Sequence, residues 1–170
     1  MRIFILSIIL ILNFVLQSTI FEYIEIFGVI PNTTIIIIAS FAILRYEIEG
    51  AIIGFFAGLL QDIFFGNVIG LNALLYMLIG YMCGKPFKDF YSENYLLPIL
   101  LVSGGTFFYN FSYYILNFLF RGRIAFLHYL RLTILPEIFY NIMLSLPIYG
   151  LVYIINTYLE NYEKPKRKVF

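Results

Sequence analysis

The chain has 170 residues and carries 11 Lys and Arg against 10 Asp and Glu, which leaves a formal net charge of +1. Its residues are 62% hydrophobic and only 12% charged, and the mean hydropathy is +0.91. Soluble domains are about 25% charged, so these values exclude an ordinary soluble protein, give no indication of nucleic-acid binding and predict an integral membrane protein.

The first predicted span covers residues 3–20. It follows Arg2 and superficially resembles a secretory signal, but no small-residue cleavage site follows it and further apolar spans come after it. We therefore expect a retained helix. Asn13 and Gln17 lie four residues apart on one face, and amide side chains are costly in lipid. That face is expected to point into a helical bundle and to form hydrogen bonds there.

The second and third predicted spans cover residues 30–45 and 48–64. In the third, glycines and one carboxylate recur at every fourth position: Gly50, Gly54, Gly58, Asp62 and Gly66. Residues four apart stack along one face of a helix, so the glycines predict a ridge on which another helix packs closely. Asp62 lies near the C-terminal end of this helix, where the helix dipole disfavours an anion, and a nearby cation is expected to compensate.

The remaining predicted spans cover residues 69–84, 95–119 and 133–158, and a basic tail covers 160–170. The fourth span holds Asn72 near its start, and the sixth holds Glu137 and Asn141. Between the fifth and sixth spans, residues 124–132 form an amphipathic piece that we expect to lie along the membrane interface. This connection carries the basic side chains of Arg121, Arg123, His128 and Arg131.

The distribution of basic residues predicts the orientation. If both termini are cytoplasmic, eight Lys and Arg lie on the cytoplasmic side, and only Arg121, Arg123 and Arg131 lie outside. Asp62 and Glu137 then also lie toward the outer side, as do Glu22 and Glu25. Two interpretations stay open for this outer polar cluster: intramolecular ion pairs that hold the bundle together, or a docking surface for a partner.

Residue patterns for catalysis or metal binding are missing from the sequence. It contains no HExxH, Walker or CxxC motif, and its only histidine, His128, lies outside the predicted spans. We therefore expect no enzymatic activity, no cofactor and no metal site.

Several stretches resemble the MreD family of the bacterial rod-shape (elongation) complex. They are residues 13–18, Pro31-Asn32, the glycine-rich segment 49–62 with Gly66, residues 70–74, and Leu135-Pro136-Glu137 with Asn141 and Pro147. The resemblance implies a six-helix bundle in the bacterial cytoplasmic membrane, similar to the substrate-binding S component of energy-coupling-factor transporters. It also implies a non-enzymatic scaffold for lateral peptidoglycan synthesis, with MreC, MreB, RodA and a class B penicillin-binding transpeptidase as partners.

A second hypothesis is a substrate-binding subunit of a vitamin or other small-solute transporter. Such a subunit is expected to show a larger cluster of polar and aromatic side chains around an outward pocket, and to bind its solute tightly. A scaffold is expected to lose function through substitutions on the glycine ridge without any ligand. Contacts with anionic lipid are expected at the basic tail.

Overall fold

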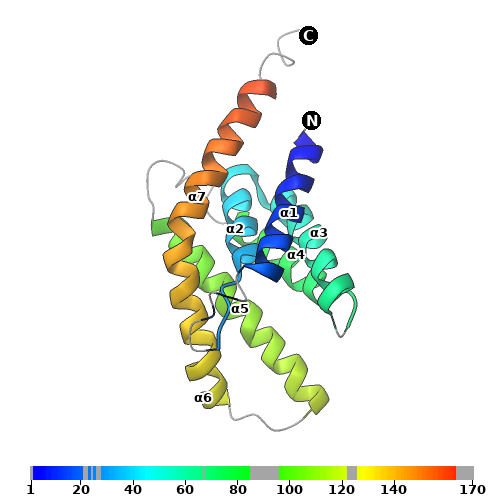
Figure 1. The fold of residues 1–170 in the computed structure, drawn as a ribbon, viewed down its shortest axis with the longest axis vertical. Coiled ribbons are helices and arrows are strands. Elements are labelled where there is room, and N and C mark those ends of the chain that lie inside the picture. The colour runs from blue at the N-terminus through cyan, green and yellow to red at the C-terminus, as the bar shows by residue number, and fades with distance from the viewer. Residues whose placement is uncertain are drawn as a thin grey trace.

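The computed structural model describes residues 2–20, 23, 25, 28–66, 68–84, 96–121 and 126–163, and the regular elements among them are helices (Figure 1). In chain order they are α1 (Arg2–Thr19), α2 (Thr33–Arg45), α3 (Glu47–Phe65), α4 (Leu71–Gly84), α5 (Leu96–Arg121), α6 (Phe126–Tyr129), the short π-helix η2 (Leu130–Ile134) and α7 (Leu135–Glu163).

Six of these helices lie where the six spans are expected. Within the described residues, three helical runs are long and apolar enough to cross a membrane: Glu47–Phe65, Leu96–Leu116 and Phe126–Asn161. Three further apolar helices are shorter: Ile3–Thr19, Thr33–Arg45 and Leu71–Gly84. The all-helical architecture and its apolar helices fit a membrane protein, whereas the number of spans stays a prediction.

The connection before the last helix differs from the expectation. We expected residues 124–132 to lie along the interface as a separate amphipathic piece. Instead, α6, η2 and α7 follow one another without a break from Phe126 to Glu163. The wider π-helical turn at Leu130–Ile134 inserts into this run without ending it, as π-bulges in longer helices do. The amphipathic segment therefore extends the last helix.

The centre of the bundle is α2. Twelve of its thirteen residues are buried, and it contacts α3, α4, α5 and α7. A helix that is apolar on all sides is stable only when protein or lipid surrounds it, and here the neighbouring helices do so. Asn32 caps its N-terminus, because the side-chain oxygen accepts a hydrogen bond from the Ile35 N–H at 3.3 Å.

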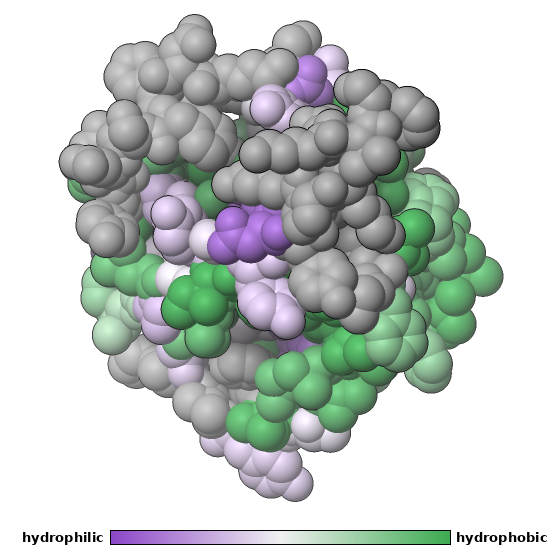
Figure 2. Space-filling model, turned by 90° about the horizontal axis from the view of Figure 1, so that it is seen from above, coloured by the Kyte–Doolittle hydropathy of each residue, from purple (hydrophilic) through white to green (hydrophobic). Residues whose placement is uncertain are grey.

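The outer surface of the bundle is strongly apolar. On α1, Ile3 and Phe4 are 81% and 70% exposed, and on α7, Phe139 and Ile154 are 68% and 66% exposed. Seen from the end at which α1 begins and α7 ends, hydrophobic side chains cover much of the right and lower flank, and a strongly hydrophilic group lies near the middle (Figure 2). Apolar patches of this extent are unfavourable in water, so this surface fits a lipid environment.

Candidate functional site

The glycine ridge of α3 packs against α4. A Cβ atom added at Gly54 would lie 2.6 Å from the carbonyl carbon of Tyr76, and one added at Gly58 would lie 2.5 Å from the Cα of Ala73. At Gly50 the added atom would lie 2.8 Å from the Gly80 carbonyl oxygen. The two backbones therefore touch along this face, and any side chain would separate them.

The face of α4 that packs against this ridge was not identified from the sequence, although two glycines on α4 indicate it. Gly80 and Gly84 lie four residues apart, and Cβ atoms at these positions would meet the backbone of Gly50 and Glu47. Gly66, in contrast, lies outside the ridge: it is the residue that follows α3, and its N–H bonds to the Asp62 carbonyl oxygen at 3.0 Å. The packing ridge thus comprises Gly50, Gly54 and Gly58.

Asp62 caps the N-terminus of α4. Its Oδ2 accepts hydrogen bonds from the N–H groups of Gly70 at 2.9 Å and Ala73 at 3.0 Å, and its Oδ1 accepts one from Asn72 at 3.2 Å. The side chain is 1% exposed. We expected a cation to compensate this carboxylate; the unpaired N–H groups and positive dipole end of α4 do so instead.

The two amides of α1 bind the first turn of α2. The Thr33 hydroxyl donates to Asn13 Oδ1 at 2.7 Å, and Asn13 Nδ2 donates to the Thr34 hydroxyl at 3.0 Å. The Thr34 hydroxyl in turn donates to Gln17 Oε1 at 2.6 Å. The face that holds Asn13 and Gln17 therefore points into the bundle, and it fixes α1 to the start of α2.

Asn141 connects three helices at the same level. It is fully buried, accepts a hydrogen bond from the Asn32 N–H at 2.9 Å and donates to the Thr106 hydroxyl at 2.9 Å. One amide of α7 thereby holds the N-terminus of α2 and the middle of α5. Buried polar networks of this kind are stable when each member has its partner.

Glu137 lies one helical turn before Asn141 and is 7% exposed. Its Oε2 accepts a hydrogen bond from Asn110 Nδ2 at 2.9 Å. Asn110 Oδ1 in turn accepts one from the Tyr129 hydroxyl at 3.4 Å. Within the described part of the chain, neither Glu137 nor Asp62 forms an ion pair.

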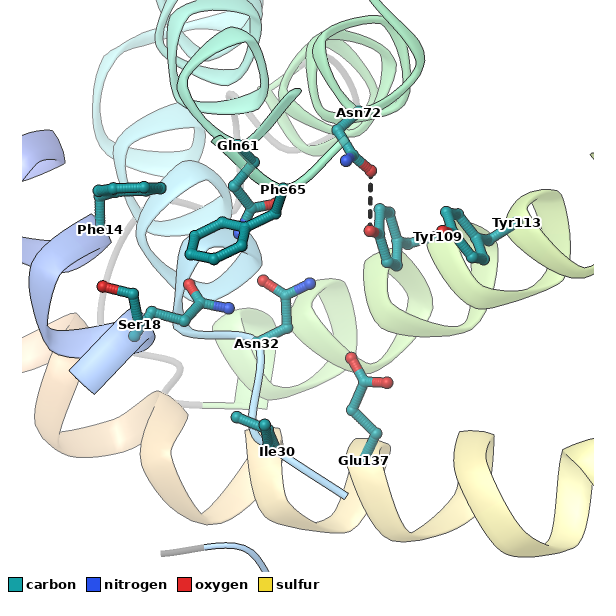
Figure 3. Close-up of a pocket in the computed structure, with 11 residues that line it drawn as sticks. Phe14, Ser18, Ile30, Asn32, Gln61, Phe65, Asn72, Tyr109, Tyr113 and Glu137 are labelled. Carbon is teal, nitrogen blue, oxygen red and sulfur yellow. Dashed lines mark hydrogen bonds between the residues drawn. The ribbon is translucent and has the colours of Figure 1, made fainter. Parts of the chain in front are cut away.

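A pocket of about 350 Å³ lies where these groups meet (Figure 3). It is lined from the end of α1, the residues before α2, the end of α3, the start of α4, the second half of α5 and the start of α7. The lining residues are Phe14, Gln17, Ser18, Ile30, Asn32, Gln61, Phe65, Asn72, Tyr109, Tyr113 and Glu137. This volume is at the small end of the range for ligand sites.

Hydrogen bonds hold several of the pocket walls in place. The Tyr109 hydroxyl donates to Asn72 Oδ1 at 2.9 Å, and the Tyr76 hydroxyl behind the wall donates to Gln61 Oε1 at 2.8 Å. The Tyr76 and Tyr109 rings stack with centroids 5.1 Å apart. The sequence had indicated Gln17, Asn72 and Glu137 as intramembrane polar residues but did not show that they line one cavity with Tyr109 and Gln61.

The structure describes part of the basic connection. His128 and Arg131 are exposed, three residues apart on α6 and η2. Arg121 is the last residue of α5, and Arg123 lies outside the described residues, as does Glu22. The structure thus places His128 and Arg131 on the surface and brings neither into contact with Asp62 or Glu137.

A second polar cluster lies at the opposite end of α2. Arg45 is 6% exposed; its Nε donates to Asn156 Oδ1, and its Nη1 lies 3.8 Å from Glu49 Oε2. Asn156 Nδ2 donates to Glu160 Oε1 at 3.0 Å. These contacts join the end of α2, the start of α3 and the last turns of α7. No group of residues suited to holding a metal ion occurs among those the structure describes.

Comparison with known proteins gives one family. The model of a family described as rod shape-determining protein MreD matches residues 1–158 of the 170-residue chain. No curated protein and no solved structure gives a match.

Proposed function

Because the chain belongs to the MreD family of rod shape-determining proteins, we propose that it is a non-enzymatic membrane scaffold of the bacterial elongation complex. In this role it organises lateral peptidoglycan synthesis together with MreC. The family match over residues 1–158 is the observation that carries the proposal, and it favours the scaffold over the solute-carrier hypothesis. Likeness to the S component of energy-coupling-factor transporters stays a prediction.

The organisation of the bundle supports a scaffold role. The α3–α4 pair is in backbone contact along its length, and buried hydrogen bonds connect α1, α2, α5 and α7 at one level. Contacts of both kinds restrict the helices to one arrangement. The glycine faces pack without free space between the backbones, and each buried polar group needs its own hydrogen-bond partner. A subunit of this kind presents a constant surface to other membrane proteins.

The proposed orientation places both termini in the cytoplasm. The start of α1 and the end of α7 lie toward the same end of the bundle (Figure 1), as does the Arg45 cluster at the end of α2. In the predicted topology this side carries eight of the eleven basic residues, as the positive-inside rule expects of a cytoplasmic side; of these eight, the structure describes Arg2 and Arg45. The pocket and the exposed pair His128 and Arg131 then lie at the outer side.

For MreC we propose a contact with the outer basic pair, His128 and Arg131, since both side chains are exposed and neither forms an ion pair within the described bundle. Arg131→Glu reverses the charge at this surface. We expect it to reduce co-purification of MreC at least tenfold, because like charges at an interface cost several kcal/mol. The matched control is Glu47→Lys, an equally large charge change in the first turn of α3 at the opposite end of the bundle.

The decisive experiment is an affinity purification of the tagged protein, followed by mass spectrometry of co-purifying proteins and small molecules. Recovery of MreC, MreB, RodA and a class B penicillin-binding transpeptidase supports the scaffold. Recovery of an ATPase together with a vitamin overturns it in favour of the carrier. If Arg131→Glu and Glu47→Lys retain MreC equally, the proposed contact at the basic pair is wrong, although the scaffold role is untouched.

A further inference from the structure

The pocket between α1, α3, α5 and α7 is lined by one carboxyl group and by no basic side chain. Of its 11 lining residues, Glu137 is the only carboxylate, and no Lys, Arg or His is among them. In Figure 3 the Glu137 carboxylate points from α7 toward the side where Asn32 and Tyr109 lie. A buried carboxylate is stabilised by a cation or by several hydrogen bonds, and within the described residues Glu137 accepts a single hydrogen bond, from Asn110.

The four amide oxygens around the pocket each accept a hydrogen bond already. Gln17 Oε1 accepts from Thr34, Gln61 Oε1 from Tyr76 and Asn72 Oδ1 from Tyr109. Asn32 Oδ1 accepts the capping hydrogen bond at the start of α2. A ligand with strong hydrogen-bond donors therefore finds its main free acceptor at the Glu137 carboxylate. A ligand that is itself an anion would place two like charges in a site of low dielectric constant.

Aromatic rings form a wall of the same pocket. Tyr109 and Tyr113 line it side by side, with ring centroids 5.9 Å apart. Phe14 and Phe65 line it from α1 and α3, with centroids 5.6 Å apart. The faces of such rings attract ammonium groups, most strongly where water is excluded. One carboxylate beside several rings is the combination that recognises a small organic cation.

We infer that this pocket binds a primary ammonium group, which pairs with Glu137 and lies against the aromatic wall. The pocket volume of about 350 Å³ restricts the occupant to a small amine or to the ethanolamine headgroup of a lipid. Ammonium binding does not depend on the scaffold role, because it rests on the pocket alone.

Two arms of one experiment distinguish the two sources of the ammonium group. In the first, the full chain in phosphatidylglycerol nanodiscs is titrated with ethanolamine and with ethylene glycol, which differ only in the charged group. We expect at least tenfold tighter binding of ethanolamine by saturation-transfer NMR. In the second, nanodiscs contain phosphatidylethanolamine and phosphatidylglycerol in equal amounts, and native mass spectrometry identifies the retained lipid. Preference in the first arm alone identifies a free amine; preference for phosphatidylethanolamine identifies a headgroup.

Glu137→Gln removes the charge and keeps the oxygen that accepts from Asn110. We expect it to abolish both preferences, whereas Glu160→Gln, the same change toward the end of the same helix, retains them. The inference is overturned if the wild-type protein binds ethanolamine and ethylene glycol equally and retains both lipids equally, a comparison that needs no variant. It is also overturned if the preferences persist in folded Glu137→Gln, or if Glu137 instead cross-links to a lysine of a co-purifying protein.

Discussion

Asp62→Asn tests whether this carboxylate is a helix cap or a docking residue. The carboxylate accepts three backbone N–H groups at the start of α4, at 2.9, 3.0 and 3.2 Å. An asparagine in the same position keeps one oxygen, and the better placement retains the two bonds to Gly70 and Ala73. The new NH₂ group then faces the N–H of Asn72, and two donors cannot bond to each other.

The expected loss follows from these contacts. Hydrogen bonds to charged groups contribute about 1.5–3 kcal/mol each, and an unpaired buried N–H costs a similar amount. Asp62→Asn is therefore expected to destabilise the bundle by about 2 kcal/mol, which in a domain of this size corresponds to a melting temperature lower by roughly 4–8 °C. Hydrogen exchange should accelerate most at the Asn72 amide.

The assay is thermal unfolding of the purified protein in one detergent. Glu47→Gln, which removes a carboxylate from the first turn of the same helix, is the matched control and should change stability by less than about 0.5 kcal/mol. Since Asp62 is 1% exposed, MreC binding per folded molecule should not change. Equal stability of Asp62→Asn and the wild type would refute the capping role, and loss of MreC from a fully stable variant would restore the docking interpretation.

Two further substitutions test the packing of the bundle. Gly54→Ala should cost about 1–3 kcal/mol, because its Cβ meets the Tyr76 backbone and overpacking forces the backbone to shift. Gly104→Ala, where nothing lies within 4 Å, should be neutral or stabilising by up to about 1 kcal/mol. Equal melting temperatures for the two variants would contradict the close approach of α3 and α4. Asn141→Ala leaves the Asn32 N–H without its acceptor and should lower the free energy of unfolding by about 2–4 kcal/mol. The control Asn161→Ala, at an exposed position on the same helix, should not alter the denaturation curve. Similar curves for the two variants would show that the Asn141 network contributes little to stability.

Local sequence patterns were sufficient to indicate the helices and two of their faces. Hydropathy located the six apolar stretches, and the spacing of Asn13 and Gln17 indicated the inward face of α1, because both signals depend only on neighbours along the chain. The glycine spacing likewise indicated a packing face on α3. Its partner, α4, was not predicted, since helix pairing is a tertiary property, although Gly80 and Gly84 carried a matching signal.

The groups that surround the Asp62 and Glu137 carboxylates could not be predicted from local sequence patterns. Asp62 is compensated by a helix that begins nine residues later, after a turn that includes Gly70 at φ +100°. A nearby cation and a helix N-terminus both supply positive potential, and only the path of the chain decides between them. The pocket could not be predicted for a similar reason: Glu137 lies in α7, Tyr109 in α5 and Asn32 just before α2, and no sequence spacing relates the three.

The burial of α2 has a consequence for the order in which the bundle assembles. Its neighbours in space, apart from α1, are α3, α4, α5 and α7, all of which leave the ribosome after it. During synthesis, the Thr33 and Thr34 hydroxyls can form hydrogen bonds only with α1. The acceptor of the Asn32 N–H, Asn141, is synthesised 109 residues later. The interior of this protein is therefore completed last, when the final helix inserts. A chain truncated before α7 would leave its most buried helix, α2, without part of its packing and without the acceptor of the Asn32 N–H.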